Sequence, residues 1–134
     1  MALMTILRRS ILIVVLAFVP SAAAANLTPA PARLVGTYTA TVPNYPDLGW
    51  YKGRYKLILG PKSTFAVHDI PGLPNITYGA SYAGNHISLP YGQGCATPGT
   101  YAWTLHGTKL DIKLVSDPCR GRAAMLVRRW SRLS

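Results

Sequence analysis

The chain has 134 residues, a length that corresponds to one domain, and 49% of them are hydrophobic while only 13% are charged. This composition excludes a disordered charged tail, because such chains are poor in apolar residues. Two cysteines are too few for a zinc ribbon or a dense disulfide scaffold. Glycine and proline number 12 and 11, which is typical of strands joined by turns.

Residues 1–25 have the order of a secretory signal peptide. Arg8 and Arg9 precede an unbroken apolar run over residues 11–19, and small residues follow at 22–25. The alternative is a membrane anchor. The apolar run is shorter than the roughly 20 residues that a helical span requires, so we favour the cleaved signal.

Cleavage after Ala25 would deliver the protein to a secreted or extracytoplasmic location. Residues 26–33 contain two prolines and predict a flexible lead-in. The remaining residues, 34–134, can bury one modest core. They contain no second long apolar run, so we expect no transmembrane span in the mature chain.

Hydrophobic residues from residue 34 onward recur with a period of two, which predicts strands. The expected strands cover 34–42, 50–59, 64–69, 75–83, 86–89, 100–105, 108–115 and 123–130. Short turns alternate with longer connections, so an up-and-down arrangement places all the longer connections at one end. We expect an all-β, eight-stranded antiparallel up-and-down barrel, with an open sandwich as the alternative.

The two cysteines support this arrangement. Cys95 and Cys119 lie in two of the longer connections, which the up-and-down order brings to the same end. We predict that they form a disulfide, which persists outside the cytoplasm. The alternative is a pair of free buried thiols.

Aromatic residues dominate the face that alternation turns inward. The inward aromatic residues are Tyr38, Tyr51, Tyr55, Phe65, Tyr78, Tyr82, Tyr101 and Trp103. They could fill a small barrel completely, or they could line a cup whose mouth carries Tyr45, Trp50, Tyr91, Arg120 and Arg122. The cup interpretation gives the candidate ligand-binding residues: Tyr38, Tyr55, Tyr78, Tyr82, Tyr101, Trp103, Arg120 and Arg122.

Catalytic and metal-binding patterns are missing from the sequence. The three histidines, at 68, 86 and 106, fall at opposite ends of the expected barrel, and two ligands are too few for a zinc site. No nucleophile motif or facing carboxylate pair is present among four aspartates. We expect no catalytic residue, metal or cofactor, and no enzyme activity. A cavity enzyme of the isomerase or cyclase type stays open as the third function.

The formal net charge of +10 indicates attraction to anions. Lysines and arginines alternate outward near residues 52–56 and 109–113. Tyr51 and Tyr55 alternate away from that basic side, whereas readers of single-stranded nucleic acid interleave exposed aromatics with basic residues. We therefore expect no specific nucleic acid partner, and an anionic cell-envelope polymer or membrane is the alternative partner.

Several segments carry a family resemblance. Residues 34–38 (LVGTY) resemble an opening Gly-x-Trp motif, with Tyr38 in the aromatic place. Residues 84–89 (GNHISL), 99–105 (GTYAWTL) and 117–122 (DPCRGR) continue the likeness. Together they resemble small secreted bacterial lipocalin-like proteins of the calycin type.

The resemblance covers residues 34–130 and implies a ligand-binding β-barrel. In lipocalins a late arginine packs across the first-strand aromatic, which implies that Arg128 or Arg129 packs on Tyr38. The expected function is non-enzymatic binding of a small hydrophobic ligand, anionic or phenolic at one end, in the barrel cavity.

Overall fold

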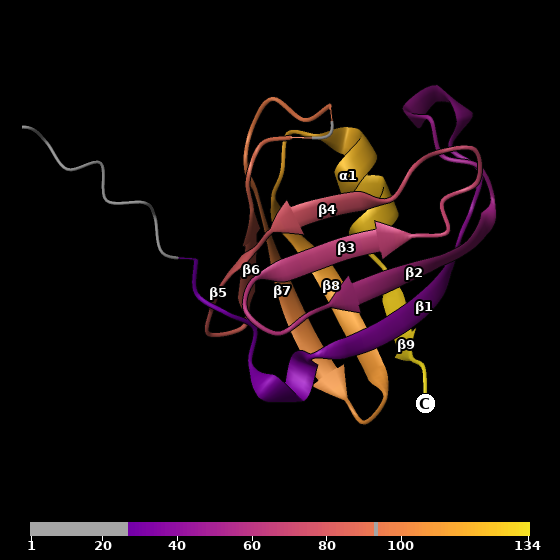
Figure 1. Ribbon diagram of the computed structural model, residues 1–134. Helices are drawn as coiled ribbons and strands as arrows, with labels where there is room; N and C mark the ends of the chain where they lie inside the picture. Colours follow the sequence, from indigo (N-terminus) through magenta and orange to yellow (C-terminus); the bar gives the residue numbers. More distant parts are fainter. Residues whose placement is uncertain (1–26, 93) are drawn as a thin grey trace, which may run out of the picture.

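The computed structural model describes residues 27–92 and 94–134. The expected signal peptide lies outside these residues. The described chain forms one nine-stranded antiparallel sheet that curls into a nearly closed barrel (Figure 1). None of its helices has the length and hydropathy needed to cross a bilayer.

The strands follow the chain almost in order. They are β1 (Gly36–Val42), β2 (Gly53–Leu59), β3 (Thr64–His68), β4 (Ile76–Gly79), β5 (Ser81–Ala83), β6 (His86–Leu89), β7 (Gly99–His106), β8 (Lys109–Ser116) and β9 (Arg129–Arg132). Their spatial order is β4-β3-β2-β1-β9-β8-β7-β6-β5, so β9 joins the first strand to the eighth. Two short 3-10 helices, η1 (Ala32–Leu34) and η2 (Pro46–Leu48), precede and follow β1.

The predicted count of eight strands is wrong, because the segment expected over 75–83 bends at Ala80 into β4 and β5. β4 pairs with β3, and β5 pairs with β6. The backbone N–H of Ala80 still donates to Ser63 at 2.8 Å. One bent strand therefore links the two ends of the sheet.

The segment 28–30, expected to be part of a flexible lead-in, lies along this bend. The N–H of Ala30 donates to Lys62 at 3.0 Å, and the N–H of Tyr82 donates to Thr28 at 3.1 Å. The segment thus connects the β2–β3 turn to β5. It satisfies backbone groups where β4 and β5 diverge.

The predicted strand over 123–130 is also wrong. Residues Arg120–Leu126 form the helix α1, and only Arg129–Arg132 form the strand β9. Short apolar runs suit either element, and the tertiary setting decides between them. Here α1 lies across one end of the barrel and buries Met125 and Leu126 completely.

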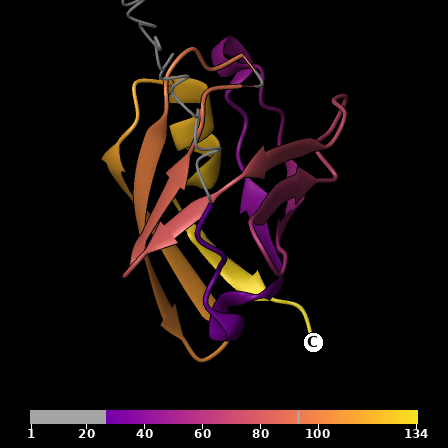
Figure 2. The ribbon, with the colours of Figure 1, turned by 60° about the vertical axis from the view of Figure 1, so that its left-hand side comes forward.

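The longer connections gather at the end that carries α1, as the connection lengths predict (Figure 2). We call this the loop end; its connections are 43–52, 69–75, 90–98 and 117–128. The opposite end, the turn end, holds the tight turns at 60–63, 84–85 and 107–108. The predicted disulfide is confirmed, with Cys95 and Cys119 joined at the loop end and a Cα–Cα distance of 5.6 Å.

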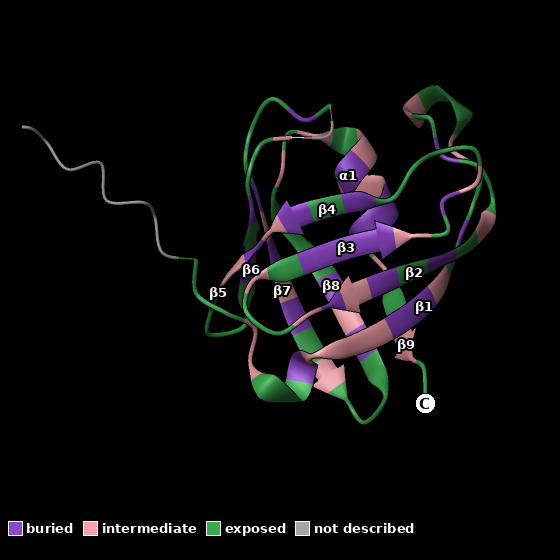
Figure 3. Cartoon of the chain, in the orientation of Figure 1, coloured by how far each residue is buried: buried purple, intermediate pink, exposed green. Residues whose placement is uncertain are grey.

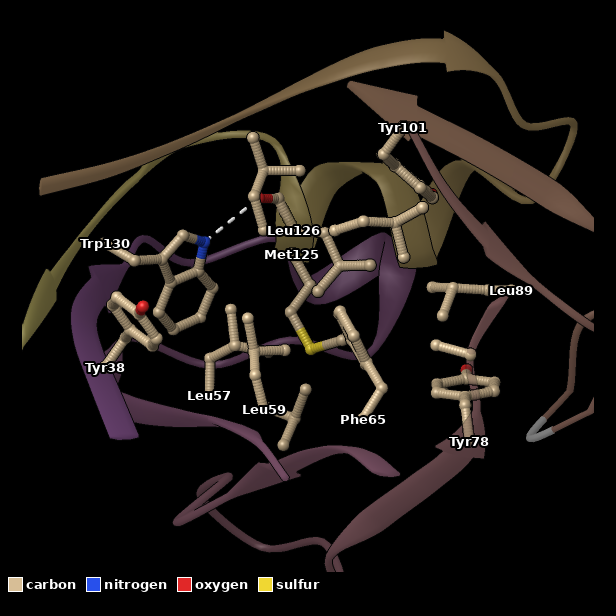
Figure 4. Close-up of a cluster of buried hydrophobic side chains, with 14 of the residues drawn as sticks. Tyr38, Leu57, Leu59, Phe65, Tyr78, Leu89, Tyr101, Met125, Leu126 and Trp130 are labelled. Carbon is tan, nitrogen blue, oxygen red and sulfur yellow. Dashed lines mark hydrogen bonds between the residues drawn. The ribbon is translucent and has the colours of Figure 1, made fainter. Parts of the chain in front are cut away.

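The barrel interior is packed with side chains. Buried positions recur along the strands, as period-two alternation requires (Figure 3). Met125 extends from α1 toward Leu59 and Phe65, and the indole N–H of Trp130 donates to Leu126 at 3.1 Å (Figure 4). α1 therefore fills the loop end of the core that the strands surround.

The period-two pattern predicts an inward position for some side chains near the strand ends that are in fact exposed. Tyr51 is 54% exposed because β2 begins only at Gly53. Leu114, expected inward, is 49% exposed next to a register shift between β7 and β8, and Val127, just beyond α1, is 38% exposed.

A late arginine does pack on Tyr38, but it is Arg132 and not Arg128 or Arg129. The Arg132 guanidinium lies 5.1 Å from the centre of the Tyr38 ring and donates to its hydroxyl at 2.6 Å. Arg132 pairs directly with Tyr38 across β1 and β9, which explains its place.

Candidate functional site

A cleft of about 370 Å³ lies at the loop end. Its walls come from the η2 connection, β4, the 90–98 connection and α1. The lining residues are Asp47, Leu48, Trp50, Ile76, Tyr78, Gly94, Cys95, Cys119, Gly121, Arg122 and Met125. A smaller hollow of about 170 Å³ adjoins it and shares Trp50 and Ile76.

Trp50 forms one wall because α1 holds its indole ring. The ring N–H donates to the Gly121 carbonyl at 2.7 Å, and the residue is 9% exposed. Its ring also packs edge-on against Tyr55, with centroids 6.5 Å apart. These two contacts fix the η2 connection against the helix.

The disulfide and a buried ion pair form the opposite wall. Arg122 and Asp117 are 1% and 0% exposed, and the arginine Nε donates to the carboxylate at 2.7 Å. The arginine also donates to the carbonyls of Pro90 at 2.7 Å and Thr97 at 2.8 Å. The ion pair therefore holds the 90–98 connection at both ends.

Asp117 gathers further donors. Its carboxylate accepts hydrogen bonds from the Tyr101 hydroxyl and from the Cys119 N–H, the latter at 2.9 Å. Burial alone would raise the pKa of Asp117, but the bonds from Arg122, Tyr101 and Cys119 outweigh burial and hold that pKa below its ordinary value. The carboxylate is therefore ionised at neutral pH and compensates the charge of Arg122.

Tyr78 supplies a polar group inside the cleft. The Arg122 guanidinium lies 5.6 Å from the centre of the Tyr78 ring. Burial raises the pKa of the Tyr78 hydroxyl, and the charge of Arg122 partly offsets that rise. The hydroxyl is therefore protonated at neutral pH and can both donate and accept a hydrogen bond.

The predicted ligand-binding residues lie in four different places. Tyr78 and Arg122 line the cleft. Arg120 is exposed on α1, and Trp103 lines a hollow of about 240 Å³ at the turn end. The others are buried in the packed core: Tyr38, Tyr55, Tyr82 and Tyr101.

Most of the core hydroxyls have partners within the protein. Tyr38 donates to Leu34 and Tyr55 donates to Tyr51, each at 2.8 Å. Tyr101 donates to Asp117. Within the described residues, the Tyr82 hydroxyl is buried with no hydrogen-bond partner.

Two residues that shape the cleft, Asp117 behind its wall and Met125 in its lining, escape sequence reasoning because other signals hide them. Asp117 precedes a proline and has the pattern of a turn residue, yet its spacing from Cys119 and Arg122 gives the Asp-x-Cys-x-x-Arg pattern of the wall. The strand expected over 123–130 includes Met125, so the position of this residue under the cleft depends on recognising α1.

Metal ligands do not gather in the described ranges, where no group of three or more His, Cys, Asp or Glu side chains could hold an ion. His68 lies at the loop end, and His86 and His106 lie at the turn end. The two cysteines are joined to each other. The cleft combines apolar side chains with one phenol, one neutralised arginine and the Asp47 carboxylate.

Comparison with known proteins found no matching family model, no matching curated protein and no matching solved structure. The geometry of the cleft is therefore what points to a function.

Proposed function

We propose that this protein is a secreted, lipocalin-like binding protein for a small hydrophobic molecule with a phenolic or similar polar end. The observation that supports this proposal is the cleft of about 370 Å³ between Trp50 and Tyr78. Its volume falls within the range of roughly 300–1,000 Å³ typical of small-molecule sites. The disulfide supports an extracytoplasmic location, because such bonds persist in oxidising compartments.

The lining favours a flat apolar ligand. Trp50, Ile76 and Met125 offer an indole ring, a branched aliphatic group and a thioether. An aromatic ligand placed against Trp50 gains stacking energy in addition to burial. The packed core excludes a ligand from the barrel axis, so the ligand lies in the cleft above it.

The charge at the cleft favours a phenol over a carboxylate. Asp117 compensates Arg122, and most donors of that guanidinium are already engaged. A second carboxylate would meet Asp117 across the ion pair and Asp47 at the rim. A phenol hydroxyl can instead bond to Tyr78 without a full charge.

Calorimetric titration with 2-naphthol, 2-naphthoate and naphthalene tests this proposal. We expect saturable binding of 2-naphthol that changes little between low and high salt, because no net charge is paired. We expect 2-naphthoate to bind at least about tenfold more weakly, as one desolvated like-charge contact costs more than 1.4 kcal/mol.

Two leucine variants on α1 provide a matched pair. A Cβ at Gly121 would touch its nearest neighbours at 3.7 Å, which is ordinary contact, so Gly121→Leu fills the cleft without a backbone clash. Ala124→Leu adds the same side chain elsewhere on α1, away from the cleft lining. Binding should be lost in the first variant and kept in the second. Equal 2-naphthol affinity in both folded variants, or no saturable binding by the wild type, would overturn the proposal.

A further inference from the structure

A row of polar residues crosses the outer face of six neighbouring strands. The register aligns, from β3 through β2, β1, β9 and β8 to β7, the residues His68, Lys56, Thr39, Ser131, Lys109 and His106. Residues two positions further along a strand share the same face. Steps of two along the strands add Arg54 on β2, Arg129 on β9, Asp111 on β8 and, after a second step, Lys113 on β8.

Arg128 adds a cation beside this row. Its Nε donates to Met125 at 2.8 Å, at the end of α1, and its Nη1 donates to the carbonyl of Thr41 at 3.1 Å. Thr41 is the partner of Arg54 between β1 and β2. We call the six cations of this region the basic girdle: Arg54, Lys56, Lys109, Lys113, Arg128 and Arg129.

Positive charge on the girdle exceeds the negative charge near it. Lys56 pairs with Asp69 at 3.2 Å, and Arg129 pairs with Asp111 at 2.8 Å. The other four cations form no ion pair within the part of the chain that the structure describes. The girdle therefore carries an excess of four positive charges on one side of the barrel.

The shape of the girdle selects among anionic partners. Lys56 and Lys109 are three strand intervals apart, about 14 Å along the barrel wall. The wall is convex, so a flat bilayer would contact only part of the row, whereas a flexible chain can follow it (Figure 1). The exposed aromatics Tyr51 and Tyr91 lie outside the strands that carry the girdle, so its cations are not interleaved with the stacking surfaces that bases of a nucleic acid require.

We propose that the basic girdle binds a flexible linear polyanion, a chain of repeating phosphate, sulfate or carboxylate groups. The bound polyanion crosses β2, β1, β9 and β8, and its successive anionic groups lie near Arg54, Arg128 and Lys113. This site is separate from the cleft at the loop end. Binding releases counterions from the polymer, so the affinity depends steeply on salt.

The test measures binding of linear inorganic polyphosphate to the full chain across a salt series. Arg54→Gln/Lys113→Gln removes two unpaired girdle cations. We expect its affinity to fall about tenfold at low salt, and the slope of log affinity against log salt to decrease by about 2. Binding of 2-naphthol should be unchanged, which separates this proposal from the function proposed for the cleft.

A charge-matched control removes two cations elsewhere. Arg33→Gln/Lys62→Asn changes residues at the turn end, and asparagine tolerates the φ of 67° at position 62. This variant should keep its affinity within about twofold, because neither cation belongs to the girdle and the charge that is lost is screened. Equal weakening of both double variants would overturn the proposal, since net charge alone would then explain the binding.

A gain of affinity provides a second test. Asp69→Asn releases Lys56 from its ion pair, and asparagine tolerates the φ of 59° at that position. We expect polyphosphate to bind a few-fold more tightly. Unchanged or weaker binding by this variant, or tighter binding of wild type to phosphatidylglycerol vesicles than to polyphosphate, would overturn the proposal.

Discussion

Arginine usually lies on the surface of a protein, but Arg122 is buried and holds several segments of the cleft wall together. Its side chain is 1% exposed, and it donates to a carboxylate and to two backbone carbonyls of the 90–98 connection. A buried charge with its partners in place is tolerated, but removing one partner leaves the other charge uncompensated. The ion pair therefore controls whether the wall of the cleft keeps its form.

We expect Arg122→Met to reduce the free energy of unfolding by about 3–5 kcal/mol, the usual cost of breaking a buried ion pair from one side. Arg122→Met/Asp117→Leu should recover part of this loss, because no unpaired charge is left. Urea denaturation of the two variants measures both effects. A loss below about 1 kcal/mol in the single variant would show that the pair is not desolvated.

Alternation predicts many of the buried residues, because a strand must turn every second side chain inward. Tyr38, Tyr55 and Trp103 follow this rule and are buried. The role of Arg122 depends on Tyr101 and Pro90, which are distant in the sequence. No local pattern carries that information, so the sequence suggests a ligand contact where the structure has an ion pair.

At the scale of elements, α1 changes what the barrel can hold. The stretch that forms it contains adjacent alanines and Met125, and such residues favour a helix. The same stretch also alternates weakly, and it is too short for the period to decide. A helix across the loop end places Met125 and Leu126 in the core and leaves a cleft above them.

Two neighbouring truncations test the contribution of α1. Leu126 is 0% exposed, so Leu126→Ala should lower the free energy of unfolding by about 2–5 kcal/mol through lost burial and a new cavity. Val127, next in sequence, is 38% exposed, and Val127→Ala should cost under about 1 kcal/mol. Thermal or urea unfolding of both variants gives the comparison, and similar losses would show that α1 does not seal the core.

At the scale of the whole molecule, the connection lengths and the cysteine positions are the sequence features that predict the fold best. They place both cysteines at one end, and the structure joins them there. They do not reveal the bend at Ala80 or the filling of the interior, since both depend on how distant segments pack. Barrel and disulfide are therefore predictable here, while the position of the cleft is not.

Removing the disulfide should destabilise the whole barrel. The bond links residues separated by 24 positions, and the chain-entropy relation gives about 3 kcal/mol for a loop of this size. Cys95→Ala/Cys119→Ala should show this loss in urea denaturation. The wild type measured with a reducing agent should match the variant, and an unchanged midpoint after reduction would contradict the expectation.

Alkaline titration should report on the packed interior. Burial raises the pKa of five tyrosines above the ordinary value of 10.0: Tyr38, Tyr55, Tyr78, Tyr82 and Tyr101. Below about pH 10 these groups are protonated in both states and stability does not depend on them. At higher pH the unfolded chain loses the protons first, so the free energy of unfolding should fall.

Phenolate absorbance followed together with circular dichroism checks this expectation. The buried tyrosines should ionise only as the native signal is lost, whereas protein in denaturant should titrate near the ordinary pKa. Complete ionisation near pH 10 with a native spectrum would show that the interior admits water.

The position of β9 has a consequence for biogenesis. This strand follows every other strand in the sequence, yet it supplies the link between β1 and β8. Until β9 has been synthesised and has paired, those two strands expose unpaired backbone edges, which invite association with other chains. The barrel therefore closes only after the last of these nine strands has been made, and the edges of β1 and β8 need protection until then.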